Sequence, residues 1–311
     1  MIVYAVNVHT GGGKVLIDEL IEGHPWGSVS YLFVDSRYNG DKARQLGIQV
    51  TAVSPNPIAR LKAEFLLQNI AACNPSETIL FFGNLLSFKR LKNKSILFLQ
   101  NCFLLHPVPL PKDSLKVIIR TLFERFWINL FIKSVDEVWV QTNWMFQLFK
   151  SQFPMIPLFL KPLQLRLQMI SEQKRDIDVI SVTSFSRHKN LNVLIDALEI
   201  LDRSLKSRII VVIVLDSKDS YEKLEEKHYL NIELSIKNSI SREELGHLYA
   251  RSKLSVITSS FESYCLPLYE SAFYGTKILA LDTPYARDSG LVTKFYSLNQ
   301  PSDLALALSE F

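Results

Sequence analysis

The sequence has few cysteines, little net charge, no long apolar run and no short-period repeat. Its 311 residues include only Cys73, Cys102 and Cys265, too few and too scattered for a disulfide framework or a structural zinc site. Thirty-five Lys and Arg against 31 Asp and Glu leave +4, well short of a nucleic-acid binder's basic stripe. The longest apolar run, Ile209–Leu215, is far below the ~18–20 residues of a membrane-spanning helix. A reducing compartment fits best.

What the sequence does have is apolar content, 48% of all residues, which is enough to offset the entropic cost of folding and excludes a disordered chain. At ~150 residues per domain, this length predicts two domains. Met1–Val8 is a strand-like run without the basic flank and cleavage site of a signal peptide, so we expect a cytoplasmic protein.

Strand-like and helix-like segments alternate along both halves, which predicts an α/β fold of two Rossmann-like, doubly wound domains. The predicted elements include strands at Met1–Val8, Ser95–Gln100, Glu137–Thr142, Asp178–Thr183 and Lys277–Leu281 and helices at Lys14–Ile21, Leu191–Leu201, Ser220–His228 and Pro267–Tyr274. Three prolines within Phe153–Pro162 predict a linker. The expected domains are therefore residues 1–160 and 161–311.

The stretch Ser259–Gly275 (SSFESYCLPLYESAFYG) carries the clearest chemical pattern. Glu262 lies in a loop after a predicted strand, and Glu270 eight residues later lies in a helix. Along a helix this spacing is ~12 Å, too far for a glycosidase pair, which needs ~5–9.5 Å. The backbone amides of Ser263, Tyr264, Cys265 and Leu266 lie between them at a helix N-terminus, which suits a diphosphate.

The two carboxylates would then bracket an elongated ligand, one binding a sugar hydroxyl and the other a ribose, as in a nucleotide-sugar. The alternative is structural: Glu262 caps or solvates a loop, and Glu270 lies on an exposed helix face.

Residues Phe261–Gly275 resemble the E-x7-E signature of retaining glycosyltransferases of family 4, which have the GT-B fold. Ser259, Glu262, Pro267, Glu270 and Gly275 are among the matching positions. Ser263 and Cys265 replace glycines of the usual pattern. We expect these changes to be tolerated if the turn does not demand φ > 0, because the phosphate contacts there are backbone N–H groups.

A second loop, Ser184–Asn190 (SFSRHKN), resembles the family's G-R-x-x-x-x-K-[GN] loop, whose basic residues neutralise the donor diphosphate. Lys189 aligns with the lysine, Ser184 stands where the arginine is usual, and Arg187 is a possible substitute. Ile236–Leu245 resembles a further strand–loop–helix run, in which backbone groups around Ile240 would contact the nucleotide base. A basic loop before a helix is otherwise an ordinary solvated surface.

The N-terminal half carries a weaker resemblance. Gly11–Gly13, and in particular Gly12 and Gly13, resemble the glycine loop near the donor phosphates, with a plain turn as the alternative. Many family members have a histidine near the sugar's reacting carbon; Asn101 occupies that position here, and His106 or His9 could serve instead. A structural role for each histidine is the alternative.

The resemblance implies transfer of a hexose from a nucleotide-diphosphate sugar to a hydroxyl acceptor with retention. Lys189, Arg187 and helix-end amides would stabilise the leaving diphosphate, so no metal and no cofactor are expected. The letters Asp176–Asp178 (DID) are the one candidate metal motif, and they open a strand instead. Two alternatives stay open: an inactive GT-B module that binds a sugar or a partner, and a GT-B nucleotide-sugar epimerase.

The short form resembles bacterial transferases that build O-antigen or capsule on lipid-linked acceptors. The implied partners are a nucleotide-sugar, a glycan acceptor and the inner face of the cytoplasmic membrane, with no nucleic acid. Lys89–Lys94 (KRLKNK) and the aromatic, basic stretch Arg120–Lys133 are candidate membrane contacts. A solvated loop for the first and an amphipathic core helix for the second are the alternatives.

Overall fold

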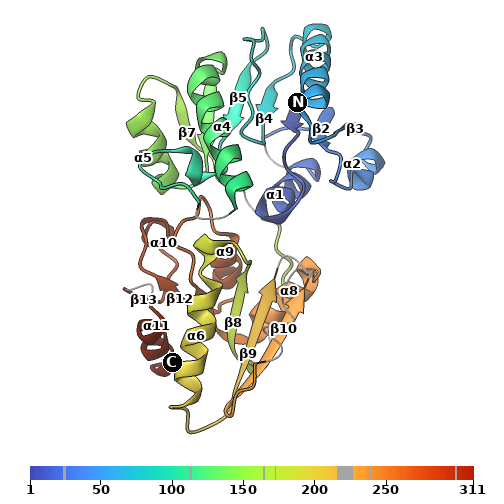
Figure 1. The fold of residues 1–311 in the computed structure, drawn as a ribbon. Coiled ribbons are helices and arrows are strands. Elements are labelled where there is room, and N and C mark those ends of the chain that lie inside the picture. The colour runs from blue at the N-terminus through green and yellow to red at the C-terminus, as the bar shows by residue number, and fades with distance from the viewer. Residues whose placement is uncertain are drawn as a thin grey trace. The chain divides into compact units, whose positions relative to one another are not determined.

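The computed structural model describes residues 1–23, 26–111, 114–163, 165–171, 173–215, 227–238, 240–297 and 300–311. The chain divides into two compact units, Met1–Arg166 and Leu167–Phe311, each built around one parallel sheet (Figure 1). In the part of the chain that is described, no helix is both long and apolar enough to cross a membrane.

The first unit has a seven-stranded sheet of order β3-β2-β1-β4-β5-β6-β7 in which every neighbouring pair is parallel. Its strands are β1 (Ile2–Ala5), β2 (Tyr31–Asp35), β3 (Gln49–Val53), β4 (Ile79–Phe81), β5 (Ser95–Phe98), β6 (Glu137–Val140) and β7 (Leu158–Leu160). Its helices are α1 (Gly11–Ile21), α2 (Asp41–Gln45), α3 (Pro57–Cys73), α4 (Leu115–Phe131) and α5 (Asn143–Gln152), with single 3-10 turns η1 (Cys102–Leu104) and η2 (Ile132–Ser134).

The second unit has a six-stranded parallel sheet of order β10-β9-β8-β11-β12-β13. Its strands are β8 (Ile177–Thr183), β9 (Ile209–Leu215), β10 (Ile232–Asn238), β11 (Ser252–Ile257), β12 (Lys277–Leu281) and β13 (Lys294–Tyr296). Its helices are α6 (Leu191–Asp202), α8 (Arg242–Arg251), α9 (Leu266–Phe273), α10 (Pro284–Ser289) and α11 (Pro301–Ser309), with the 3-10 turn η3 (Arg187–Lys189). The helix predicted at Ser220–His228 lies outside the described residues except for Lys227 and His228.

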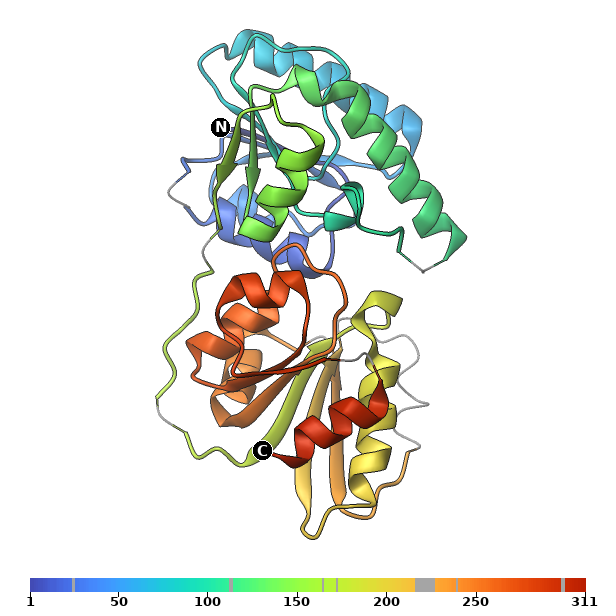
Figure 2. The ribbon, with the colours of Figure 1, turned by 90° about the vertical axis from the view of Figure 1, so that its left-hand side faces the viewer.

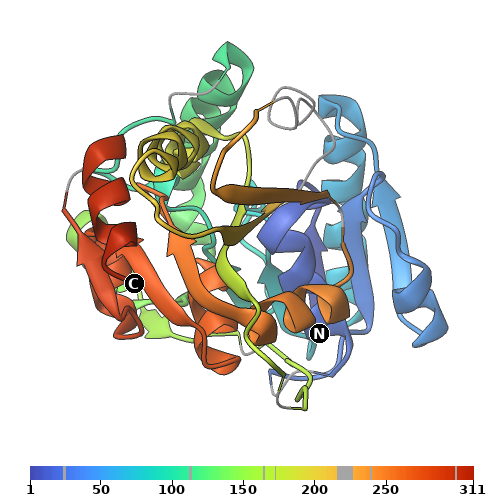
Figure 3. The same ribbon diagram turned by 90° about the horizontal axis from the view of Figure 1, so that it is seen from below.

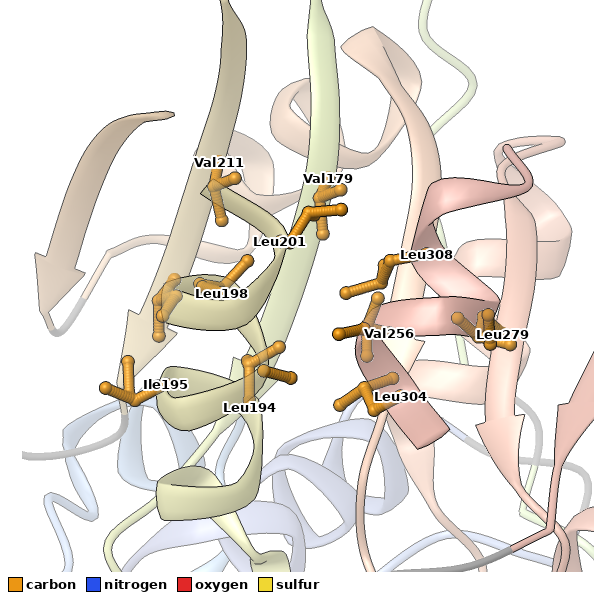
Figure 4. Close-up of a cluster of buried hydrophobic side chains, with 14 of the residues drawn as sticks. Val179, Leu194, Ile195, Leu198, Leu201, Val211, Val256, Leu279, Leu304 and Leu308 are labelled. Carbon is orange, nitrogen blue, oxygen red and sulfur yellow. The ribbon is translucent and has the colours of Figure 1, made fainter. Parts of the chain in front are cut away.

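The core of the second unit explains its strand-like sequence runs. Successive side chains of a strand face opposite sides of the sheet. Val179 therefore packs under α6 and α11, whereas Ile180 packs in the cluster on the other face. Figure 4 shows Leu194 and Leu198 of α6 and Leu304 of α11 converging on this sheet, and Figures 2 and 3 show the two helices on one face of it. Strands buried on both faces need continuous apolar runs, which accounts for the alternating βαβ pattern.

The linker predicted at Phe153–Pro162 is wrong in its central part. Leu158–Leu160 forms β7, which pairs with Val138–Val140 of β6 as the edge strand of the first sheet. Proline is compatible with this place because an edge strand has one side free of ladder hydrogen bonds. The division between the units falls after Arg166.

Each sheet reverses its winding at one point, between β1 and β4 in the first unit and between β8 and β11 in the second. In open α/β sheets, ligands bind beyond the carboxyl ends of the strands at such a switch point. The loops after β8 and β11 are the two loops that carry the sequence motifs, so the topology brings both motifs to one place.

Candidate functional site

The two motif loops of the second unit are joined by a set of hydrogen bonds. Asn190 has a left-handed backbone, with φ +52°. Its side-chain amide donates hydrogen bonds to the Thr258 carbonyl and to Ser260 Oγ, both at 2.7 Å. The Thr258 hydroxyl donates to the Lys189 carbonyl at 2.5 Å, and the Ser260 amide donates to the His188 carbonyl at 2.8 Å. The loop after β8 is therefore fixed on the loop after β11.

Lys189 and Glu262 meet at this junction. Lys189 Nζ lies 2.5 Å from Glu262 Oε1, and their side chains are 22% and 13% exposed. Both residues line one small pocket with Thr183, Cys265 and Pro267 at the carboxyl ends of β8 and β11. The ammonium group, the carboxylate and the start of α9 therefore surround the same small volume, and Glu262 forms an ion pair that joins the two loops.

The turn before α9 contradicts one sequence expectation. Cys265 is the N-cap of α9 and has φ +55°, in the left-handed region that favours glycine. The turn does demand φ > 0 at this position, and cysteine adopts it at a cost of about 1–2 kcal/mol. Ser263 is not among the positive-φ residues, so its replacement of glycine carries no such strain.

The predicted helix bounds around this turn are close to those observed. Leu266 is the first residue of α9, Pro267 stands in its first turn, and Gly275 follows its end with φ +66°. Tyr264 stacks on Tyr269 of α9 with ring centroids 4.2 Å apart. Burial raises the pKa of the Cys265 thiol, so it stays protonated at neutral pH.

Glu270 points into the second unit and does not lie on an exposed helix face. It is buried, its Oε2 accepts a hydrogen bond from the Tyr249 hydroxyl at 3.4 Å, and its Oε1 lies 3.4 Å from Arg242 Nη2. Burial raises the pKa of Glu270, an effect that the Arg242 charge opposes. Burying a carboxylate in this way costs free energy of desolvation, and buried carboxylates with shifted pKa values are typical of functional sites.

The contact with Arg242 links Glu270 to the predicted base-binding run. Arg242 is the first residue of α8, and Ile240 lies two residues before it. Ser241 caps this helix by accepting a hydrogen bond from the Glu244 amide at 3.1 Å. The structure therefore brings Ile240 to the region of Glu270, although Glu270 does not line the pocket of Lys189 and Glu262.

Two further residues of this site were missed in the sequence. Arg242 was passed over because a basic residue at a helix start goes against the usual helix-dipole preference and carries no motif. Thr183 ends β8 and lines the pocket, and its buried hydroxyl has no hydrogen-bond partner. Its only signal in the sequence is its place as the last residue of a predicted strand.

The two candidates for the family's arginine differ in their surroundings. Ser184 is buried, and its Oγ accepts a hydrogen bond from the Ser186 amide at 3.4 Å. Arg187 is exposed and lies in η3 together with Lys189. Ser184 therefore shapes the loop, and of the two only Arg187 brings a positive charge to it.

In the first unit, the predicted glycine loop is part of a helix. Gly12 and Gly13 lie in the first turn of α1, which begins at Gly11 with φ +61°. A Cβ placed on Gly13 would lie 2.9 Å from Cγ1 of Val8 and 3.8 Å from Oε1 of Gln100. Glycine at this position lets α1 approach the preceding loop closely.

Asn101 and His106 occupy different settings. Asn101 caps η1, where its Oδ1 accepts a hydrogen bond from the Phe103 amide at 3.0 Å. His106 is exposed and precedes a cis proline, and its backbone amide donates to Gln152 Oε1 at 3.0 Å. Asn101 directly follows Gln100, so it lies near the Gly13 turn.

His9 is the histidine of the β1–α1 loop and lies at the switch point of the first sheet. It is half-buried, and its Nδ1 is buried without a hydrogen-bond partner. Burial, together with the nearby Arg37 guanidinium, lowers its pKa. His9 is thus a neutral imidazole at pH 7 with one unused ring nitrogen.

The two aspartates of the DID motif, Asp176 and Asp178, do not form a cluster of metal ligands. Asp176 makes a two-point ion pair with Arg251, at 2.8 and 2.6 Å, and Asp178 pairs with Lys253 at 2.7 Å. Across the described residues, no three His, Cys, Asp or Glu side chains gather as metal ligands would.

Comparison with known proteins agrees with this arrangement. Residues 168–289 match the family model described as glycosyl transferases group 1. The serotype-specific mannosyltransferase WbdA of Escherichia coli is 35% identical over 91 residues, which are 29% of this chain and 11% of WbdA. The chain therefore spans only a small part of that relative's length.

Two solved structures cover nearly the whole chain. HepE of Anabaena, in complex with UDP, has a TM-score of 0.67 at 13% identity and covers 99% of this chain and 89% of its own. Sucrose-phosphate synthase of Thermosynechococcus elongatus has a TM-score of 0.69 at 10% identity, with coverages of 99% and 88%. The chain therefore has the GT-B fold, and its second unit is a domain of the glycosyltransferase type.

Proposed function

We propose that this protein is a retaining glycosyltransferase that moves a hexose from a nucleotide-diphosphate sugar to a hydroxyl of a glycan. One observation carries the proposal. Lys189 and Glu262, from two loops at the switch point of a parallel sheet, meet beside the N-terminus of α9. A cation and helix-end amides suit a diphosphate, and a carboxylate beside them suits sugar hydroxyls.

The residues take distinct roles in this proposal. Lys189, with Arg187 and the backbone amides of Ser263–Leu266, binds and neutralises the diphosphate. Glu262 orients the hexose by accepting hydrogen bonds from its hydroxyls. Glu270 accepts hydrogen bonds from the ribose, and backbone groups at Ile240 contact the base.

The reaction then needs no separate general base. The bond between the anomeric carbon and the diphosphate oxygen breaks, and the acceptor oxygen bonds the same carbon on the same face. The acceptor's proton passes to the departing phosphate oxygen. Lys189 and the helix-end amides stabilise the charge that develops on this leaving group. We therefore propose a metal-independent reaction, which predicts full activity in the presence of EDTA.

The acceptor that we propose is a lipid-linked glycan of the O-antigen or capsule type, with the protein acting at the inner face of the cytoplasmic membrane. The similarity to WbdA, a serotype-specific mannosyltransferase, supports this choice and makes mannose the first sugar to test. The HepE structure contains UDP, so UDP-sugars are tested beside GDP- and dTDP-sugars.

The proposal is tested by donor binding and transfer with these three groups of nucleotide-sugars. We expect thermal stabilisation by one group, transfer with retained anomeric configuration by NMR, and loss of both in Lys189→Ala. Lys253→Ala is the matched control, because Lys253 also forms an ion pair with a carboxylate of the second unit, that of Asp178, but lies near the amino end of β11. Unchanged donor binding in Lys189→Ala would overturn the site assignment.

Two other outcomes identify the alternative functions. Donor binding without transfer to any acceptor would favour a binding module, for which Ser184 in place of an arginine is the supporting observation. Conversion of the donor into its epimer without an acceptor would favour an epimerase.

The residue beside the reacting carbon is proposed to be Asn101 or His106, with Gly12 and Gly13 near the donor phosphates. Asn101→Asp keeps an oxygen that can cap η1, whereas Asn101→Ala does not. A loss of kcat in both Asn101 variants, with His106→Ala unaffected, would assign the role to Asn101.

A further inference from the structure

Helix α4 presents its apolar side chains to the outside. Its buried residues are Thr121, Glu124, Arg125 and Ile128, of which three are polar or charged. The exposed ones include Leu115, Ile119, Leu122, Phe126 and Leu130, each at least 48% exposed. A helix that only covers a sheet has the opposite distribution. The sequence-based alternative of an ordinary amphipathic core helix is therefore wrong for this segment.

Polar contacts fix this orientation of α4. Arg125 donates from Nε to the Phe103 carbonyl and from Nη2 to the Val108 carbonyl, both at 2.6 Å. Trp127 donates from its indole N–H to the Leu86 carbonyl at 2.8 Å. Rotation of the helix to hide its apolar face would break these bonds and turn Arg125 toward solvent. The Phe103, Val108 and Leu86 carbonyls would then lose these donors, and a buried acceptor left unpaired costs about 1–3 kcal/mol.

Helix α3 continues the apolar face. Of the 22 large apolar side chains that are exposed in the described residues, eleven lie on α3, on α4 or at Phe88. A pocket of about 580 Å³ opens between the two helices, with Leu61 of α3, Phe88 and Phe123 of α4 among its walls. Figure 2 shows the two helices, light blue and green, side by side across the first unit. We call this surface the α3–α4 face.

Among the described residues of α3, of α4 and of the segment 86–94, the exposed charged side chains are all positive. Lys62, Lys116 and Arg120 are exposed on the two helices, and Lys89 and Lys92 are exposed on the segment next to them. The carboxylates of α3 and α4, Glu64 and Glu124, are buried. A chain whose net charge is only +4 therefore concentrates cations around this apolar face.

We propose that the α3–α4 face docks on a lipid bilayer that contains anionic lipids. Interfacial helices bury an apolar face at the acyl-chain boundary, and their cations contact anionic headgroups. A second copy of this chain would bring two cationic rims together and is disfavoured by charge. The α3–α4 face is thus the surface through which the proposed glycosyltransferase would contact the membrane. The evidence for this docking comes from the α3–α4 face alone, so it does not depend on which activity the second unit has.

The apolar part is tested with Ile119→Ser/Phe126→Ser in the full chain, by co-sedimentation with phosphatidylcholine vesicles with and without phosphatidylglycerol. Both side chains are exposed, at 58% and 62%, so the variant keeps its fold, which circular dichroism checks. We expect binding to the anionic vesicles to fall at least about tenfold. Leu306→Ser on α11, also at an exposed apolar position, is the control and keeps full binding.

The charged part is tested with Lys62→Glu/Lys116→Glu, with Lys206→Glu as the control at an exposed position of the second unit. Each lost cation weakens binding about fivefold, and added salt weakens wild-type binding in the same direction. Equal binding to neutral and anionic vesicles, or a self-association that Ile119→Ser/Phe126→Ser abolishes, would overturn the proposal. Donor binding by the second unit is unchanged in these variants, so failure here is distinct from failure of the proposed function.

Discussion

Lys189 Nζ lies 2.5 Å from Glu262 Oε1, although 73 residues separate them in the chain. The pair joins the loop after β8 to the loop after β11, the two strands at which the second sheet reverses its winding. Without a ligand, the ammonium group has a carboxylate partner. A bound diphosphate would replace the carboxylate of Glu262 as the partner of the Lys189 ammonium group. The carboxylate could then accept hydrogen bonds from sugar hydroxyls, so the two residues can bind both halves of a donor.

The first prediction separates these two roles. Lys189→Met weakens nucleoside-diphosphate binding by about tenfold to a hundredfold, because a charge-assisted hydrogen bond contributes about 1.5–3 kcal/mol. Glu262→Gln leaves nucleoside-diphosphate binding unchanged or tighter, since it removes a negative charge beside the phosphates, but it lowers sugar transfer. Calorimetry with the nucleotide alone and kcat with the full donor measure the two effects. Equal loss of nucleotide binding in both variants would contradict the assignment.

The second prediction concerns the buried carboxylate of Glu270. The pKa of Glu270 is raised in the folded protein, so the folded state binds this proton more tightly than the unfolded state does. The stability that results is fully present below the ordinary pKa of a glutamate and is lost as the pH rises through the raised pKa. At neutral pH the ionised group costs stability. Glu270→Gln therefore raises Tm at pH 7.5, and this gain shrinks toward pH 4.5, while donor affinity falls. The exposed Glu233→Gln controls for the substitution, and a lower Tm of Glu270→Gln at pH 7.5 would contradict the prediction.

The third prediction uses the left-handed backbone of Cys265. At ordinary φ, alanine is more stable than glycine by about 0.5–1 kcal/mol. At φ +55° the order reverses, so Cys265→Gly is more stable than Cys265→Ala by about 1 kcal/mol in chemical denaturation. Cys102 is buried without a positive φ, and there the alanine variant is the more stable one. The same order at both cysteines would mean that the Cys265 turn does not need φ > 0.

The fourth prediction concerns the pH dependence of His9. Its folded pKa lies below the ordinary value, because burial and Arg37 oppose its protonation. The unfolded chain therefore binds the proton more readily, and the stability that neutral His9 gives is lost as pH falls below about 6.5. His9→Gln reduces the drop in Tm between pH 7.5 and 5.5, and His106→Gln serves as a matched control. An unchanged drop in His9→Gln would exclude this role.

The sequence predicted part of the site because some of its residues carry local signals. A helix start after a strand, marked by Pro267 and ended at Gly275, follows from backbone preferences alone. Glu262 stands next to such a start, whereas Lys189 was assigned through the resemblance of its loop to the family's basic loop. Arg242 and Thr183 were not predicted, because only the packing of α8 and the end of β8 brings them there.

The difference between local sequence signals and tertiary packing also explains two sequence expectations that were wrong. The prolines of Phe153–Pro162 predicted a linker, but whether Leu158–Leu160 pairs depends on a free strand edge at β6, which local sequence does not record. The residues of α4 have a helical pattern, but the pattern does not say which face turns inward. Arg125 turns inward because the Phe103 and Val108 carbonyls are there to accept its hydrogen bonds.

The sequence by itself therefore determined two parallel α/β sheets, since continuous apolar runs and glycine or proline signals are local and additive. The tertiary structure alone decided the ion pair of Lys189 with Glu262, the burial of Glu270 and the outward apolar face of α4. These depend on strand order and on partners far apart in the chain. The free energy of a charge or an apolar group is set by its surroundings, which exist only after the elements have packed.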